Sequence, residues 1–195
     1  MLDTRARKHV QPLFDKAADL LIKLGFTANG VTIAAFITGL VAAVAVGFEY
    51  LVPAVAILWV SGFLDAVDGT VSRKTGTSGP LGTLMDIVFD RIVEIGVLLA
   101  LIVIQPELAV YVAVVNATII ITMVVFLTVG ATAKVQTEKT FYYQAGVAER
   151  TEGFIMLSLA ILLQDHRRIV LIVFAAMILF TAIQRFVEAV RLLKK

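Results

Sequence analysis

Five acidic residues lie within two strongly apolar stretches of the sequence. Two of them are three positions apart and the other three recur at every fourth position, so each set lies along one face of a helix. A carboxylate at the centre of a bilayer costs at least about 2.5 kcal/mol, and a group of carboxylates therefore requires a compensating cation. The five residues are Asp65, Asp68, Asp86, Asp90 and Glu94.

This set of oxygen ligands predicts a site for divalent cations. The chain contains no cysteine, which excludes cysteine-based zinc sites, iron–sulfur sites and a cysteine nucleophile. Carboxylate oxygens favour magnesium, manganese or calcium before zinc. A structural salt-bridge network is the alternative, but Arg91 is the only basic residue in the same two stretches.

The residues between the two acidic sets suit a pyrophosphate group. Glycines directly after Asp68 and one turn before Asp86 would let a phosphate approach the backbone and the metals closely. The planar guanidinium of an arginine matches phosphate oxygens, and hydroxyl groups follow it. Helix packing by the glycines and membrane anchoring by Arg73 with Lys74 are the alternatives. The group comprises Gly69, Arg73, Thr77, Ser78 and Gly82.

The composition predicts that membrane helices position these residues. The 195-residue chain is 59% hydrophobic and 16% charged, whereas soluble domains carry about 25% charge. We expect one all-α integral membrane domain, residues 1–195, with six spans of about 20 residues. The fifth span has a short apolar part, so its helix either begins near Val147 or is partly buried. The expected spans are Thr27–Phe48, Val52–Ser72, Gly82–Ile104, Leu108–Ala133, Val147–Gln164 and Ile169–Val190.

Flanking segments predict the orientation of the chain. Residues 2–24 have apolar positions at helical spacing and indicate an amphipathic helix in the membrane interface. Lysine and arginine concentrate on one side of the six spans, and the other side has only Arg167 and Arg168, which predicts cytoplasmic N- and C-termini. The turn containing Gly76, Gly79 and Pro80 makes the second and third spans antiparallel neighbours with a site that faces the cytoplasm. The net charge is +2, and the basic residues are scattered between the apolar stretches and do not cluster on a polar domain. This distribution argues against nucleic acid as a partner.

The pattern Asp65-x2-Asp68-Gly69-x2-Ser72-Arg73-x8-Gly82-x3-Asp86-x3-Asp90 resembles the signature of the CDP-alcohol phosphotransferases. The family has alanine where this chain has Ser72. The stretch Thr27-Ala28-Asn29-Gly30-Val31-Thr32 resembles the family's Thr-Pro-Asn-x-x-Thr, with Ala28 in place of proline; a helix cap is the alternative interpretation.

The resemblance implies a homodimeric enzyme that transfers a phosphatidyl-type group from CDP-diacylglycerol or CDP-archaeol to a small polar alcohol and releases CMP. Two magnesium or manganese ions would be held by Asp65, Asp68, Asp86 and Asp90 and would grip the CDP pyrophosphate, with Asp90 as general base. The residues implied to bind the CDP-lipid are Asn29, Thr32, Asp65, Asp68, Gly69, Ser72, Arg73, Ser78 and Gly82.

Three cations are candidates for binding the acceptor alcohol. Lys134, Arg150 and Arg185 are similar in position to residues that bind the acceptor phosphate in the inositol-phosphate-using branch of the family. We therefore expect a phosphorylated polyol, inositol phosphate ahead of glycerol 3-phosphate. The alternatives are interface anchoring by Lys134 and Arg150, and an i+3 ion pair between Arg185 and Glu188.

A divalent-cation transporter is the rival class, since intramembrane acids also mark ion pathways. Transporters often contain internal repeats, and none is visible in this sequence. Gly69, Arg73 and Gly82 would have no role in moving a cation. The sequence therefore favours the transferase.

Overall fold

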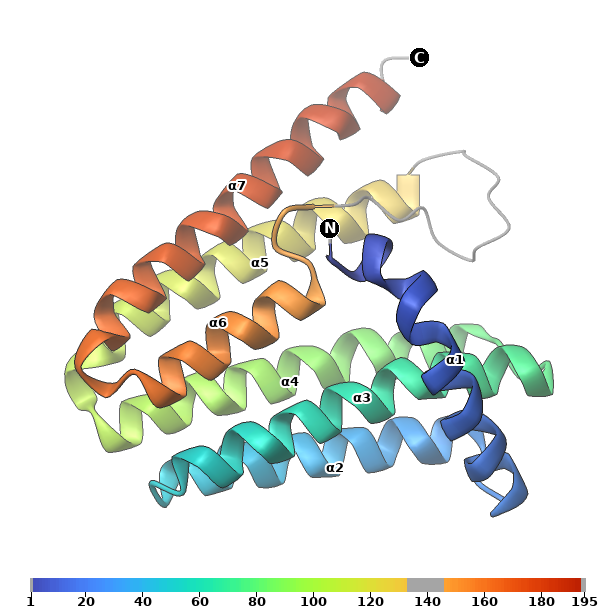
Figure 1. Cartoon of the computed structure of the whole chain (residues 1–195). Helices are drawn as coiled ribbons and strands as arrows, with labels where there is room; N and C mark the ends of the chain where they lie inside the picture. Colours follow the sequence, from blue (N-terminus) through green and yellow to red (C-terminus); the bar gives the residue numbers. More distant parts are fainter. Residues whose placement is uncertain (1, 133–145, 194–195) are drawn as a thin grey trace. The chain divides into compact units, whose positions relative to one another are not determined.

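The computed structural model describes residues 2–132 and 146–193, and every regular element in these ranges is a helix (Figure 1). The all-α prediction is confirmed over this part of the chain. The helices form two compact units, Thr4–Pro106 and Met1–Asp3 with Glu107–Lys195. In chain order they are α1 (Leu2–Lys23), α2 (Ala28–Gly47), α3 (Leu51–Thr75), α4 (Pro80–Ile104), η1 (Pro106–Leu108), α5 (Ala109–Thr132), α6 (Arg150–Leu162), η2 (Gln164–His166) and α7 (Arg167–Leu193).

Four of the described helical segments are long and apolar enough to cross a membrane. They are Ala28–Gly47, Leu51–Thr75, Pro106–Thr132 and Gln164–Arg191. With 25 residues α4 has a sufficient length, but it carries three carboxylates and an arginine. The 13 residues of α6 rise only about 20 Å, less than the roughly 30 Å of a hydrocarbon core. The chain is therefore a membrane protein in which two further helices depart from the usual pattern of a span.

The shortness of α6 decides between the two predictions for the fifth apolar stretch. The helix begins at Arg150 and not near Val147, because Glu149 at its N-cap has an extended backbone with φ −88° and ψ −172°. More than half of its residues are buried, among them Phe154, Leu157 and Ile161. The structure thus shows the partly buried helix.

Small residues on α2 let two other helices approach its backbone. Ser61 on α3 donates a hydrogen bond from Oγ to the carbonyl oxygen of Ala35 at 2.7 Å. A Cβ atom on Gly39 would lie 2.5 Å from a methyl carbon of Val93 on α4 and 2.9 Å from Ser61 Oγ. Accordingly α2 packs closely against both α3 and α4. The expected neighbours α3 and α4 are thus held together largely through α2.

The N-terminal helix α1 packs against the ends of α2 and α3 that lie nearest to the acidic residues. Ala18 is fully buried with Val67 and Val71 of α3, and the ring of Phe14 lies 5.7 Å from that of Phe63. The opposite side of α1 exposes large apolar residues, including Leu13 and Leu20, and Leu24 just after the helix is also exposed. Lys74 links the two helices through hydrogen bonds to Asp15 O at 3.1 Å and Asp19 Oδ1 at 2.7 Å.

In the other unit, α7 packs against α5 and α6. Thr122 on α5 donates to the carbonyl oxygen of Ile178 at 3.3 Å. The buried guanidinium of Arg167 donates to the carbonyl oxygens of Ala160 and Ile161 at 3.0 and 3.2 Å and so caps the end of α6. Arg168 forms an ion pair with Glu107. Arg167 and Arg168 are the two cations predicted to lie on the outer side of the membrane. In the structure Arg167 caps a helix and Arg168 pairs with an acidic residue.

Candidate active site

The acidic residues of α3 and α4 lie on either side of a short, sharply defined turn. The last helical residue of α3 is Thr75, and Gly76 ends the helix in the left-handed conformation with φ 67°. Glycine adopts this conformation without the steric cost of a Cβ atom. After Gly79, the helix α4 begins at Pro80, whose fixed φ and missing N–H suit the first turn of a helix. The C-terminal part of α3 and the N-terminal part of α4 are therefore adjacent along the chain.

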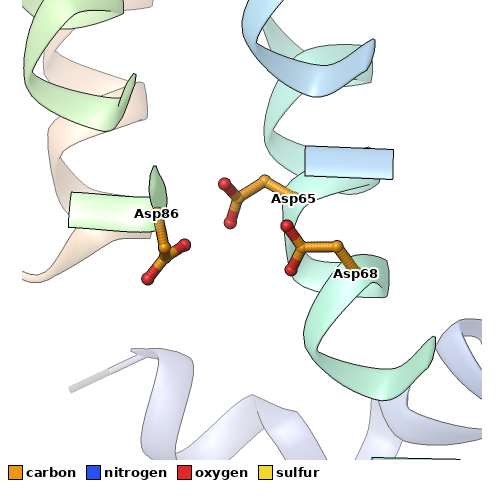
Figure 2. Close-up of side chains that lie close together, drawn as sticks. All are labelled: Asp65, Asp68 and Asp86. Carbon is orange, nitrogen blue, oxygen red and sulfur yellow. The ribbon is translucent and has the colours of Figure 1, made fainter. Parts of the chain in front are cut away.

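Three carboxylates converge from these two helices. Asp65 and Asp68 on α3 and Asp86 on α4 each offer an oxygen, and these atoms lie within 4.8 Å of one another. Figure 2 shows the side chains of Asp65 and Asp68 extending from one helix toward Asp86 on the other. Asp65 and Asp68 are buried, with 7% and 8% of their surface exposed. The spacing along each helix predicted which residues share a face, and the structure brings the two faces together.

The donor chemistry of this carboxylate cluster (Asp65, Asp68 and Asp86) fits a divalent cation. Three carboxylates at such separations repel one another, and a cation with a preference for oxygen ligands relieves this repulsion. Magnesium and manganese prefer carboxylate oxygens. Asp90 lies one helical turn beyond Asp86 on α4, which places it on the same face of the helix.

The residues expected to bind the pyrophosphate also lie in the unit that contains the cluster. A Cβ atom on Gly69 would lie 3.4 Å from Nη1 of Arg73, and a Cβ atom on Gly82 would lie 3.8 Å from Oδ1 of Asn29. The side chain of Asn29, in the first turn of α2, therefore lies near Gly82, in the first turn of α4. Two helix N-termini at one place favour an anion, because their backbone N–H groups carry partial positive charge.

Hydroxyl groups line the same region. Ser72 and Ser78 lie on either side of the turn, and their Oγ atoms are 3.0 Å apart. Thr32 on α2 donates a hydrogen bond to Asp68 Oδ2 at 2.5 Å. The structure thus relates Ser72 to Ser78 and Thr32 to Asp68, two contacts that the spacing of the motif did not indicate.

Two contacts that orient charged groups were missed in the sequence. Nη2 of Arg73 donates to Oγ1 of the buried Thr70 at 2.9 Å. The buried Glu94 forms an ion pair with Arg91, with Nη1 to Oε2 at 2.5 Å and Nη2 to Oε1 at 3.0 Å. Both pairs are three residues apart on a helix, so the i, i+3 spacing was the available signal.

The three acceptor-site candidates belong to another part of the chain. Lys134 lies outside the described residues. Arg150 is the first residue of α6, with its guanidinium carbon 5.8 Å from the ring centre of Phe154. Arg185 on α7 is 7% exposed, with its guanidinium carbon 5.2 Å from the ring centre of Phe126. Arg150 and Arg185 lie in the unit that begins at Glu107, whereas the aspartates lie in Thr4–Pro106.

The sequence is similar to those of two known proteins. Archaetidylinositol phosphate synthase of Pyrococcus horikoshii is 35% identical over 98 residues, or 50% of this chain and 52% of that protein. The chain thus spans about half the length of this relative. Inner membrane protein YnjF of Escherichia coli is 27% identical over 176 residues, or 83% of this chain and 82% of that protein.

A solved structure shares the fold. Phosphatidylinositol phosphate synthase (PgsA1) of Mycobacterium tuberculosis with CDP-DAG bound matches with a TM-score of 0.76 at 18% identity, over 91% of this chain and 94% of that one. The same protein has also been solved in complex with manganese and citrate, and matches with the same TM-score and identity over 90% of this chain and 88% of that one. The sequence model of a single family, CDP-alcohol phosphatidyltransferase, matches residues 26–184, most of the chain. This chain therefore belongs to the CDP-alcohol phosphatidyltransferase family.

Proposed function

We propose that the protein is a metal-dependent phosphatidyltransferase of phospholipid biosynthesis, which transfers a phosphatidyl-type group from a CDP-lipid to an alcohol and releases CMP. The observation that carries this proposal is the convergence of Asp65, Asp68 and Asp86 from two largely apolar helices. Membership of the family supports the reaction class. The donor is CDP-diacylglycerol or its ether-linked counterpart, CDP-archaeol.

The carboxylate cluster and Asp90 form the proposed site for two magnesium or manganese ions. When bound, these ions neutralise the pyrophosphate and make CMP a better leaving group. Structures of the similar mycobacterial protein with manganese and with CDP-DAG support this assignment.

The donor site is completed by residues around the turn between α3 and α4. Arg73, held by Thr70, supplies positive charge to the pyrophosphate. Gly69 and Gly82 leave room for the phosphates near the backbone, and the N-termini of α2 and α4 add partial positive charge. The remaining proposed contacts are with Asn29, Thr32, Ser72 and Ser78.

Asp90 is proposed as the general base. The acceptor hydroxyl oxygen attacks the lipid-side phosphorus, and a P–O bond forms while the bridging P–O bond of the pyrophosphate breaks. The hydroxyl proton passes to the Asp90 carboxylate, and CMP departs with the electron pair of the broken bond. The position of Asp90, one turn from Asp86, supports a place beside the reacting phosphorus.

The proposed acceptor is a phosphorylated polyol, inositol phosphate ahead of glycerol 3-phosphate. Arg185 supports an anionic acceptor, because a buried cation in a membrane helix usually faces a polar cavity or a charged partner. Arg150 and Lys134 are the other proposed phosphate ligands. The names of the archaeal and mycobacterial relatives, both synthases of inositol phosphate lipids, agree with this choice.

In the membrane we propose a single domain with six spans, α2 to α7, and α1 in the interface. The exposed leucines on one side of α1 support a helix that lies on the bilayer surface. The lysine and arginine distribution supports cytoplasmic N- and C-termini and a cytoplasmic active site. We further propose that the protein is a homodimer, as the family resemblance implies.

An acceptor screen tests the proposed function. Purified protein in detergent would receive CDP-diacylglycerol or CDP-archaeol, magnesium and one of four acceptors: inositol phosphate, glycerol 3-phosphate, inositol or serine. We expect CMP release with inositol phosphate, its loss in excess chelator and its return with magnesium or manganese. Asp65→Ala and Asp68→Ala should weaken metal and nucleotide binding together.

Two results would contradict the proposal. Full activity in excess chelator would refute the metal site. Accumulation of metal in protein-containing liposomes, without CMP release from any CDP-lipid, would identify a cation transporter instead.

A further inference from the structure

The carboxylate cluster is contacted by a third helix through one hydroxyl group. Thr32 on α2 donates from Oγ1 to Asp68 Oδ2 at 2.5 Å, and both residues are buried, at 5% and 8% exposure. Hydrogen bonds to an ionised acceptor are shorter than neutral ones and about twice as strong. The contact joins residues 36 positions apart in the sequence.

The hydroxyl group of Thr32 has one proton and two acceptors within reach. The second acceptor is the carbonyl oxygen of Ala28, one turn earlier, at 3.1 Å. Other threonines in this chain make that local bond, as Thr38 does to the carbonyl oxygen of Ala34 at 2.7 Å. The shorter distance and the charge of the carboxylate direct the proton of Thr32 to Asp68.

The backbone on both sides of this hydrogen bond is held by apolar packing. Ala28 and Val31 on α2 and Val67 and Val71 on α3 are buried in one cluster with Ala18 of α1. The first turn of α2 is also capped, because Thr27 Oγ1 accepts a hydrogen bond from the N–H of Gly30 at 3.1 Å. Thr32 therefore has a fixed position from which it can orient a flexible carboxylate.

We propose that Thr32 is a positioning residue of the metal site: its hydroxyl group holds one oxygen of Asp68 and so fixes the orientation in which this carboxylate binds a cation with Asp65 and Asp86. This role rests on the proposed function of the cluster. A carboxylate has two oxygens with about four acceptor positions, so one hydrogen bond leaves capacity for a metal. Residues that orient metal ligands in this way typically contribute about tenfold to hundredfold to metal affinity.

Manganese binding by the purified protein in detergent tests this role without catalysis. Electron paramagnetic resonance measures free Mn²⁺ during a titration with no CDP-lipid present. Thr32→Val removes the hydroxyl group but keeps the shape, and we expect about tenfold to hundredfold weaker binding. Thr32→Ser keeps the hydroxyl group and should bind as the wild type does. Thr38→Val, on the same helix, is the matched control and should leave the affinity unchanged.

The outcomes distinguish a failure of the positioning role of Thr32 from a failure of the metal-site assignment. Thermal melts establish that each variant is folded, and Thr32→Ala is a second variant without the hydroxyl group in case valine prevents folding. Wild-type affinity in a folded variant that lacks the hydroxyl group, while Asp68→Ala loses binding, would overturn the positioning role and leave the site intact. Unchanged Mn²⁺ binding in Asp68→Ala would instead contradict the metal site and with it the proposed function.

Discussion

Three charged residues in and beside the candidate site contact a different neighbouring side chain each. Asp68 accepts a hydrogen bond from Thr32, Arg73 donates to Thr70, and Glu94 is paired with Arg91. Charges in an apolar environment are stabilised by such partners or by a metal ion. The candidate site is therefore more than four aspartates, because side chains on three helices contact its charged groups.

Replacing Asp90 tests its proposed role as the general base. Asp90→Asn should lower the turnover number for CMP release by about a hundred- to ten-thousandfold, because an amide cannot accept the proton of the acceptor hydroxyl group. Binding of CDP-lipid in the presence of metal should be retained, since the amide has nearly the same shape. Steady-state kinetics and a CDP-lipid titration measure the two quantities.

The exposed Asp165 provides a control for this substitution, and Asp165→Asn should be as active as the wild type. Near-normal turnover of Asp90→Asn would remove Asp90 from the role of base. A Mn²⁺ titration of the same variant shows whether Asp90 is also a ligand.

The spacing of residues predicted part of the site and could not predict the rest. Asp65 with Asp68, and Asp86 with Asp90, share helix faces because helical periodicity is a local property. The contact of Thr32 with Asp68 depends on how α2 packs against α3, and residues 36 apart give no local signal of it. Thr70 and Arg73 are three residues apart, so that contact was open to prediction.

At the scale of elements, α2 is the helix that brings the other two together. Gly39 lies where a side chain of α3 and a side chain of α4 both approach the α2 backbone. In membranes, small residues at helix contacts allow such close approach, which improves packing where lipid supplies no hydrophobic driving force. Ala35, Gly39 and Ala43 recur at every fourth position along this face.

Adding one methyl group to α2 should therefore destabilise the unit. In Gly39→Ala the new Cβ would lie 2.5 and 2.8 Å from the two methyl carbons of Val93, a stiff branched side chain, so helices must shift. Overpacking of this kind costs about 1–3 kcal/mol. We expect a lower melting temperature in detergent.

Two further variants make this test specific. Gly47→Ala, at the end of the same helix and with no atom within 4 Å of its added Cβ, should be neutral or slightly stabilising. Gly39→Ala combined with Val93→Ala should recover part of the lost stability. A melting temperature of Gly39→Ala equal to that of the wild type would show that α2 and α4 do not pack as described.

Helix ends were predicted to within about one residue for α1, expected over residues 2–24 and observed to end at Lys23, and for α2, expected to end at Phe48 and observed to end at Gly47. The fifth stretch was ambiguous because Glu149 and Arg150 interrupt its apolar character, and the chain begins the helix only after this interruption. The close approach of α2 to both α3 and α4 was not predicted. In helices this uniformly apolar, residue type does not distinguish a lipid-facing side from a protein-facing side.

At the scale of the whole molecule, the donor-site candidates lie in one compact unit and the described acceptor-site candidates in the other. Thr4–Pro106 contains the complete signature of acidic residues, glycines and Arg73. Arg150 and Arg185 follow in the second unit. In the proposed assignment, the first unit supplies the residues for the CDP-lipid, and the second unit supplies Arg150 and Arg185 for the phosphate of the alcohol.

Arg185 tests the contribution of the second unit. Arg185→Ala should raise the Michaelis constant for inositol phosphate about tenfold to hundredfold, because a charge-assisted hydrogen bond contributes about 1.5–3 kcal/mol. The Michaelis constant for the CDP-lipid should change little. Arg191→Ala removes an exposed cation from the same helix and serves as the control.

The alternative role of Arg185 gives a different result. If it mainly pairs with Glu188, the variant should have a lower melting temperature and both substrates should be affected equally. Equal saturation of the wild type by an unphosphorylated alcohol such as serine would contradict the phosphorylated acceptor.

The short helix α6 leaves part of its proposed path across the membrane to the non-helical residues that precede it. As a proposed span it covers about 20 Å of a hydrocarbon layer roughly 30 Å thick. The residues just before it, Gly146 to Glu149, are not helical, and Ala148 N–H donates to Thr181 Oγ1 on α7 at 2.8 Å. Non-helical backbone at membrane depth is tolerated against protein or water but not against acyl chains. If α6 spans the membrane as proposed, a polar molecule that reaches this segment would meet backbone hydrogen-bonding groups that a continuous helix would have bonded internally.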